Sequence, residues 1–135
     1  MPGGRAFLDS NIPLYLIGSD LTKAAVADGL ILAGGTISLQ VLAEVATVAR
    51  RKHALSWDEI EDVLGVLREV CDVVELTSRM FSHAVELARQ TGYALDDCQI
   101  IAAALASGCD VLYSEDMQDG HEIDGVLTIR NPFKI

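Results

Sequence analysis

Acidic side chains stand at four separate points of the sequence where a folded α/β chain would bring them together. Asp9 directly follows a short apolar run, and Asp116 lies two residues beyond another one. Ligands of open parallel sheets bind outside the carboxyl ends of the strands, so both carboxylates are expected at that edge. Asp97 begins an apolar segment and Glu44 lies on the polar face of an amphipathic one. Both are candidates to join the same cleft.

A cluster of four or five carboxylates predicts a particular chemistry. Like charges a few ångströms apart cannot all stay ionised without compensation. Hard divalent cations supply it, and Mg²⁺ and Mn²⁺ prefer oxygen ligands. Such sites chiefly serve phosphoryl transfer, in which a metal lowers the pKa of a bound water. The acids therefore favour metal-dependent phosphoryl transfer, with Asp119 as a fifth candidate.

Each acid also has a purely structural interpretation. Helix caps, solvated helix faces and turns are typical places for a lone Asp or Glu. Two of the acids nevertheless follow predicted strands, which favours a shared site over six unrelated roles. The acids for which both interpretations stay open are Asp9, Glu44, Asp96, Asp97, Asp116 and Asp119.

The elements that would position these acids alternate along the chain. Apolar runs predict strands at residues 5–8, 36–39, 72–76, 111–114 and 126–129. Amphipathic or capped segments predict helices at about 13–18, 21–32, 39–53, 56–70, 78–90 and 96–107. The last of these helices is apolar on nearly every side, which is typical of an interior helix. The alternation predicts a parallel sheet with helices on both faces.

Length and charge narrow the class of protein. The 135 residues match one domain, taken here as residues 1–135. Ten basic against twenty acidic residues give a net charge of −10, which excludes a protein that coats DNA through a broad basic face. The one dense basic run is residues 50–52, and Arg51 shares a helix face with Glu44. Arg51 is therefore the candidate for a phosphate contact, although the run would also suit a helix C-terminus.

Other site chemistries find little support in the sequence. The three cysteines have no metal-like spacing and are expected to be buried, reduced thiols. The three histidines form no HExxH, and no P-loop, GxGxxG or GxSxG is present. The N-terminus lacks a signal-peptide pattern, and the longest apolar run is seven residues, from 100 to 106. A cytoplasmic protein without a membrane segment is expected.

Five segments share their order and separation with a known family. They are Phe7-Leu8-Asp9-Ser10-Asn11, Leu42-Ala43-Glu44-Val45 and residues 97–105, 112–120 and 125–133. With them the chain resembles, over essentially its whole length, the PIN-domain family and in particular the VapC-type ribonuclease toxins of bacterial toxin–antitoxin pairs. One departure is the Ala94-Leu95-Asp96 approach to the helix of Asp97, where the family usually has a Ser-Tyr type.

The resemblance implies a fold, an activity and a site. The fold would be a three-layer sandwich with a five-stranded parallel sheet between helices. The activity would be Mg²⁺- or Mn²⁺-dependent cleavage of RNA, with an antitoxin protein as partner and a homodimer as the assembly. The catalytic acids fall on Asp9, Glu44, Asp97 and Asp116, of which Asp9, Asp97 and Asp116 would hold the metal, and the supporting residues on Asn11, Ser114 and Asp119.

Two other functions remain open. A catalytically silent PIN-fold binding module would share the architecture without the reaction. A phosphoacceptor signalling domain would share the size, the sheet and the acidic cleft, but it would need an acid pair after the first strand, where only Asp9 stands. A phosphatase of the haloacid-dehalogenase type would need Asp-x-Asp, and Asn11 occupies the second position.

Overall fold

A mixed six-stranded sheet forms the centre of the computed structural model, which describes residues 5–134. Its strand order is β3-β2-β1-β4-β6-β5, and all neighbours are parallel except β5 and β6. The strands are β1 (Ala6–Leu8), β2 (Thr36–Ser38), β3 (Asp72–Val74), β4 (Val111–Tyr113), β5 (Glu122–Ile123) and β6 (Leu127–Arg130).

The α/β class is confirmed, and the predicted strand number needs a correction. Five strands form the expected parallel sheet, but β5 adds a sixth strand, antiparallel to β6. Two residues are too few to give the alternating pattern by which a strand is recognised in a sequence. The turn between β5 and β6 places Asp124 and Gly125 at positive φ, so it is a tight hairpin.

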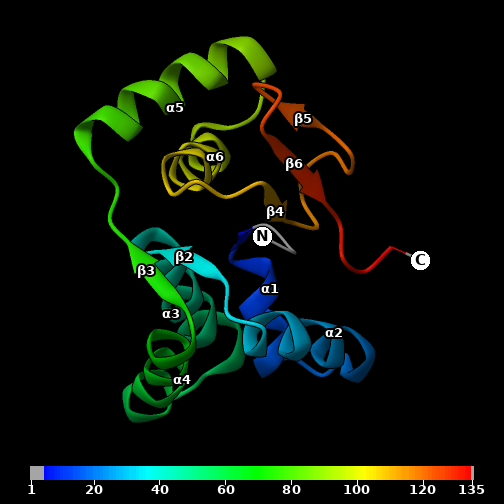
Figure 1. Ribbon diagram of the computed structural model, residues 1–135. Helices are drawn as coiled ribbons and strands as arrows, with labels where there is room; N and C mark the ends of the chain where they lie inside the picture. The colour runs from blue at the N-terminus through cyan, green and yellow to red at the C-terminus, as the bar shows by residue number, and fades with distance from the viewer. Residues whose placement is uncertain (1–4, 135) are drawn as a thin grey trace.

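Helices cover both faces of the sheet, as the three-layer prediction requires. In Figure 1, α5 and α6 lie on one side, and α1 to α4 lie on the other. The helices are α1 (Asn11–Leu14), which continues into the 3₁₀ turn η1 (Tyr15–Ile17), α2 (Leu21–Leu32), α3 (Leu39–His53), α4 (Trp57–Val70), α5 (Ser78–Thr91) and α6 (Leu95–Ala106).

Capping side chains fix where the long helices begin. Ser38 accepts a hydrogen bond from the backbone N–H of Val41 at the start of α3. Ser56 and Glu59 form the reciprocal capping box that the sequence predicts for α4. The start of α3 matters for the site, because it sets which residues of this helix lie beside the ends of the strands.

The interior helix α6 is the main contributor to the core beside the sheet. Six of its twelve residues are buried, and it packs along α5 and against β2 and β4. This confirms the sequence prediction of an interior helix. The three cysteines are also buried and unpaired with one another, as expected for reduced thiols. The buried residues of α6 are Cys98, Ile100, Ile101, Ala102, Ala103 and Ala104.

Two sequence findings concern the chain ends and membranes. Residues 1–4, on which part of the expectation about a signal peptide depends, lie outside the described residues. None of the helices within residues 5–134 has the length and hydropathy to cross a bilayer.

Truncating the core side of α6 is expected to destabilise the fold. Ile101 is 0% exposed, so Ile101→Ala leaves a cavity and should lower the free energy of unfolding by about 2–4 kcal/mol. Val66→Ala on α4, where the side chain is 52% exposed, is the control and should cost less than about 1 kcal/mol. Urea unfolding of both variants measures the difference, and equal losses would contradict this placement of α6.

Candidate active site

The topology of the sheet puts the candidate site between β1 and β4. From β1 the chain proceeds to β2 and β3 on one side, and it then returns to place β4 on the other side of β1. After two such neighbouring parallel strands, the connecting segments turn to opposite sides of the sheet. This leaves a crevice at the carboxyl ends of the strands, where open α/β sheets bind ligands. Leu8 pairs with Tyr113 at this edge, so Asp9 and Ser114 follow the two strands side by side.

Asp9 is a buried carboxylate at the end of the central strand. Only 4% of the Asp9 surface is exposed to solvent. One oxygen accepts a hydrogen bond from the backbone N–H of Ser10 at 2.7 Å. The other accepts from the Ser114 hydroxyl at 2.8 Å and from the Asn11 amide at 3.4 Å. Donors from both neighbouring strand ends therefore hold this carboxylate in one orientation.

Asn11 connects the two strand ends through a single side chain. Its Nδ2 donates to the Asp116 carboxylate at 3.1 Å and also lies within hydrogen-bond distance of Asp9. Its Oδ1 accepts from the backbone N–H of Glu115 at 3.2 Å. The Ser114 hydroxyl in turn accepts from the backbone N–H of Asp116 at 3.2 Å. The two residues predicted to support the acids thus contact both Asp9 and Asp116.

Glu44 reaches the same edge from α3. It is partly buried, and its Oε2 accepts a hydrogen bond from the Ser10 hydroxyl at 2.9 Å. Ser10 is a contact that the sequence analysis missed. The two residues are 34 positions apart, and no local pattern relates them. In the sequence, the only indication that Ser10 belongs to the site is its position directly after Asp9.

Asp97 enters from α6, and the charges of its neighbours show that it faces the other acids. The pKa of Asp97 is raised to about 6, chiefly by burial and in addition by the nearby carboxylates of Asp96, Asp116 and Glu44. Gln40 on α3 donates to the backbone carbonyl of Asp96 at 3.2 Å, which ties the two helices together beside the site. Asp96 itself is exposed, whereas Asp97 is partly buried.

Burial also dominates the electrostatics of Asp9. Loss of solvation is the largest of the effects that together raise the pKa of Asp9 to about 6, even though the hydrogen bonds from Ser114 and Ser10 lower it. The charges of Asp97 and Glu44 add to the increase. The raised pKa values of Asp9 and Asp97 show that the donors in the protein do not fully compensate this negative charge.

The donor set suits a hard cation, although the side chains are not arranged around one point. Asp9, Glu44, Asp97 and Asp116 offer only oxygen ligands, and two of them carry the raised pKa that a nearby dication would lower. Among residues 5–134, no group of three or more Asp, Glu, His or Cys side chains has the arrangement of a formed metal site.

Two predicted residues lie apart from this cluster. Asp119 is exposed, and its carboxylate accepts from the backbone N–H of Asn131 at 2.8 Å, so it holds the tail that follows β6. Arg51 is exposed in the last turn of α3. Its neighbour Lys52, rather than Arg51, lines a cavity together with Asn11.

Glu115 is a further acid at this edge, and the protein neutralises it. The Tyr15 hydroxyl and the Lys23 ammonium both donate to its carboxylate. Burial alone would raise the pKa of Glu115, but these two donors lower it below its usual value. The Lys23 ammonium also lies 5.3 Å from the centre of the Phe133 ring, so the cluster includes the C-terminal tail. Sequence analysis missed this cluster because its members are far apart along the chain.

Comparisons with solved structures agree on the fold. A toxin–antitoxin complex from Klebsiella pneumoniae matches with a TM-score of 0.74 at 21% identity, over 96% of this chain and 99% of that one. VapC20 from Mycobacterium tuberculosis, described as a sarcin–ricin loop cleaving toxin, matches with a TM-score of 0.67 at 21% identity, over 82% and 89%. VapBC2 from Rickettsia felis, bound to a promoter DNA fragment, matches with 0.66 at 21% identity, over 93% and 97%.

Sequence comparison gives the family. A search of curated proteins finds no match. The model of the PIN domain family matches residues 6–119, which is most of the chain and includes every acid placed at the sheet edge. On this match, the chain belongs to the PIN domain family.

Proposed function

We propose that the chain, taken as one domain over residues 1–135, is a metal-dependent endoribonuclease and the toxin of a toxin–antitoxin pair. One observation carries the proposal. Four acids at the positions expected for a PIN nuclease come from two strand ends and two helices to one crevice, where neighbouring carboxylate charges add to the burial that raises the pKa of Asp9 and Asp97. Membership of the PIN domain family and the likeness to toxin structures support the same activity.

Mg²⁺ or Mn²⁺ is the cofactor that this donor set would hold. Asp9, Asp97 and Asp116 are the proposed ligands, and Glu44 would complete the site and position the attacking water. A bound dication would supply an activated water at neutral pH and offset the charge that develops on phosphorus. Asn11 and Ser114 keep Asp9 and Asp116 in fixed orientations. The hydroxyl of Ser10, just before α1, holds Glu44.

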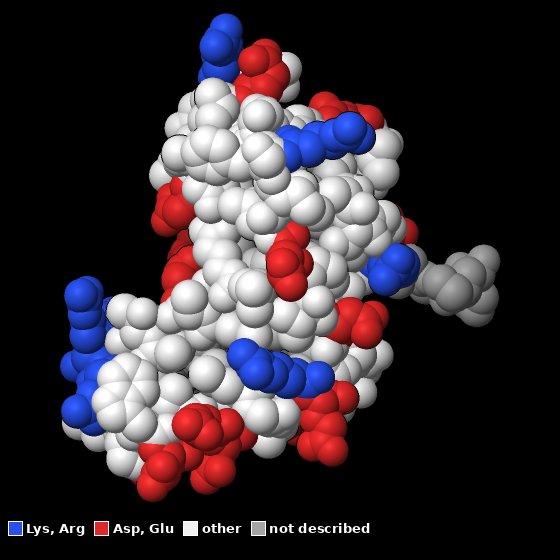
Figure 2. All heavy atoms as spheres, turned by 90° about the vertical axis from the view of Figure 1, so that its left-hand side faces the viewer, with Lys and Arg blue, Asp and Glu red and all other residues white. Residues whose placement is uncertain are grey.

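A polyanionic substrate has to be held by local rather than overall charge. The chain carries a net charge of −10, and the face in Figure 2 shows separate basic side chains among acidic and uncharged ones, without a continuous basic surface. The last turn of α3 contains Arg50, Arg51, Lys52 and His53 in succession. We therefore keep Arg51 as a proposed phosphate contact, and Asp119 as a supporting residue that acts through the tail.

Exposed apolar side chains indicate where protein partners would bind. Leu21 and Leu32 on α2 are 80% and 67% exposed, and Trp57 on the adjacent α4 is 60% exposed. The two helices offer this apolar surface to an antitoxin segment. Phe81 and Val85 on α5 are also exposed, on the opposite layer, and would suit a homodimer contact. These partners and a cytoplasmic location belong to the proposal.

One observation favours a second function, a catalytically silent binding module. The acids of residues 5–134 do not form a ready-made metal site. A silent module need not bind Mn²⁺, whereas a nuclease must. Calorimetric titration with MnCl₂ separates the two, since heat of binding that disappears in Asp97→Asn supports the nuclease, and no heat with the native chain supports the module.

Cleavage of RNA tests the nuclease directly. A pool of structured RNA should be cut in the presence of Mn²⁺, and Asp9→Asn and Asp97→Asn should each lower the rate by about two orders of magnitude, because each removes a charge from the site. Asp28→Asn, at an exposed position of α2, is the matched control and should keep the native rate. Mapping of the cut ends measures the activity. Equal cleavage by the native chain and Asp9→Asn would end the proposal.

Stability against pH tests the uncompensated charge without any RNA. The folded chain binds a proton at Asp9 more tightly than the unfolded chain, because burial raises this pKa from 3.8 to about 6. In EDTA, the free energy of unfolding should therefore fall as the pH rises through this window, and Asp9→Asn should be about 1–2 kcal/mol more stable than the native chain at pH 7.

The same measurement has a metal arm and a control. MnCl₂ should raise the Tm of the native chain and leave that of Asp9→Asn nearly unchanged, because the cation binds the folded state through Asp9. Asp28→Asn should follow the native chain in both arms. A native stability that is flat between pH 4 and 6 and insensitive to MnCl₂ would contradict the proposed charge balance.

A further inference from the structure

A cavity lies directly beside the carboxylates and is not used by them. Its volume is about 380 Å³, and its walls come from α1 and η1, the loop before α2 and the last turns of α3. Asn11 belongs to both places, since it lines the cavity and donates to Asp116. Any molecule in this cavity would therefore lie next to a group bound at the carboxylates.

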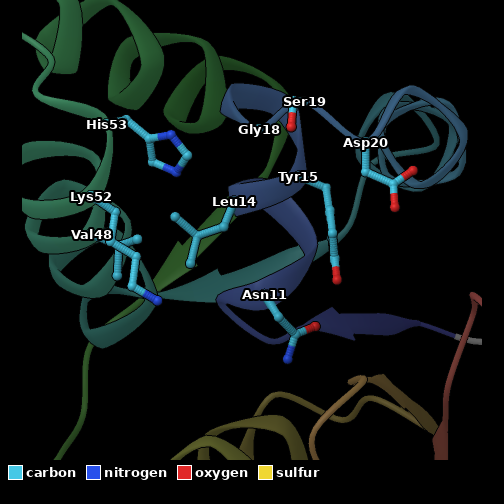
Figure 3. Close-up of a pocket in the computed structure, with 9 residues that line it drawn as sticks. All are labelled: Asn11, Leu14, Tyr15, Gly18, Ser19, Asp20, Val48, Lys52 and His53. Atoms are coloured by element: carbon cyan, nitrogen blue, oxygen red, sulfur yellow. The ribbon is translucent and has the colours of Figure 1, made fainter.

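The walls combine apolar surface with positive charge. Leu14 and Val48 face each other from α1 and α3, and Tyr15 follows Leu14 at the start of η1 (Figure 3). Tyr15 is already engaged, since its hydroxyl is held by Glu115 and its ring packs edge-on against Phe133, with the ring centres 4.8 Å apart. Leu14 and Val48 are therefore the apolar side chains left to contact a ligand. Lys52 and His53 extend from the end of α3 on the side opposite Asp20. The cavity thus offers apolar side chains with the cationic Lys52 on one side.

The acid on the other side is already engaged. Asp20 caps α2, because its carboxylate accepts from the backbone N–H of Lys23 at 3.1 Å. Lys52 belongs to the densest basic turn of a chain whose net charge is −10. A ligand with a planar apolar part and a negative charge therefore complements the α3 side of the cavity.

We propose that this cavity holds the nucleotide next to the cleaved phosphodiester of a single-stranded RNA, an inference that rests on the proposed nuclease. The unpaired base packs against Leu14 and Val48, and Lys52 binds a flanking phosphate. A base within a duplex is stacked and paired and cannot enter, whereas an unpaired base can turn out of the strand. The carboxylates and the cavity share Asn11, so one strand passes over both.

Photocrosslinking locates the base. Asp9→Asn protein, which should bind without cutting, is mixed with a short random-sequence RNA in which 4-thiouridine replaces uridine, and it is irradiated with long-wavelength ultraviolet light. Mass spectrometry should find crosslinked peptides that contain Tyr15 or His53, both of which line the cavity. A duplex RNA competitor should suppress these crosslinks far less than unlabelled single-stranded RNA does. Crosslinks confined to other surfaces overturn the assignment.

Binding of the same RNA, measured by fluorescence anisotropy, tests the two kinds of contact. In the Asp9→Asn background, Lys52→Gln should weaken binding about fivefold and lower the salt dependence by about one phosphate contact. Val48→Phe, which narrows the cavity, should weaken it about tenfold. Arg79→Gln, on α5 in the opposite layer, is the charge control and should stay within about twofold. Equal affinities of the Lys52 and Arg79 variants overturn the proposal.

The outcomes separate this inference from the nuclease. If the native chain cuts RNA in Mn²⁺ but the cavity is neither crosslinked nor sensitive to Lys52→Gln, the nuclease stands and the nucleotide site is wrong. If the cavity binds RNA but the native chain does not cut it, the nuclease is wrong and the site belongs to a silent module. A cavity that serves a partner peptide instead gives no crosslinks and no effect of either variant on RNA binding.

Discussion

Burial of the Asp9 carboxylate at the end of the central strand is the constraint on which the site depends. Three donors are within hydrogen-bond distance of it, and two of them lie close, at 2.7 and 2.8 Å. The pKa of Asp9 is nevertheless raised to about 6, so loss of solvation outweighs these hydrogen bonds. The fold therefore holds a carboxylate in place while stabilising its charge only in part.

The strand order converts this constraint into a site. β1 and β4 are neighbours because the chain changes direction across the sheet between them. Their register places Asp9 beside Ser114, and the Asn11 amide spans the remaining gap to Asp116. Asp97 arrives on the interior helix α6, whose apolar residues fix its position. Residues with no functional role thus determine where the acids meet.

The sequence predicted those features that local patterns encode. The bounds of α2 and α3 follow from their apolar spacing and from Ser38, a cap that the structure also contains. The alignment of acids with strand ends predicted that Asp9 and Asp116 would lie at one edge, where the Asn11 amide contacts both. The strand β5 was missed because it has two residues. The contact of Ser10 with Glu44 was missed because 34 residues separate the partners and only the fold relates them.

Glu115 shows why acid content alone does not define this site. It stands between Ser114 and Asp116 in sequence, and a count of carboxylates would include it. Its charge is instead matched by Lys23 and by the Tyr15 hydroxyl, which lower its pKa, whereas Asp9 and Asp97 keep raised values. Among these neighbouring acids, Glu115 is therefore paired within the protein, whereas the charges of Asp9 and Asp97 are compensated only in part. That division, which no spacing in the sequence encodes, is the reason that the crevice between β1 and β4 is the place proposed for a cation.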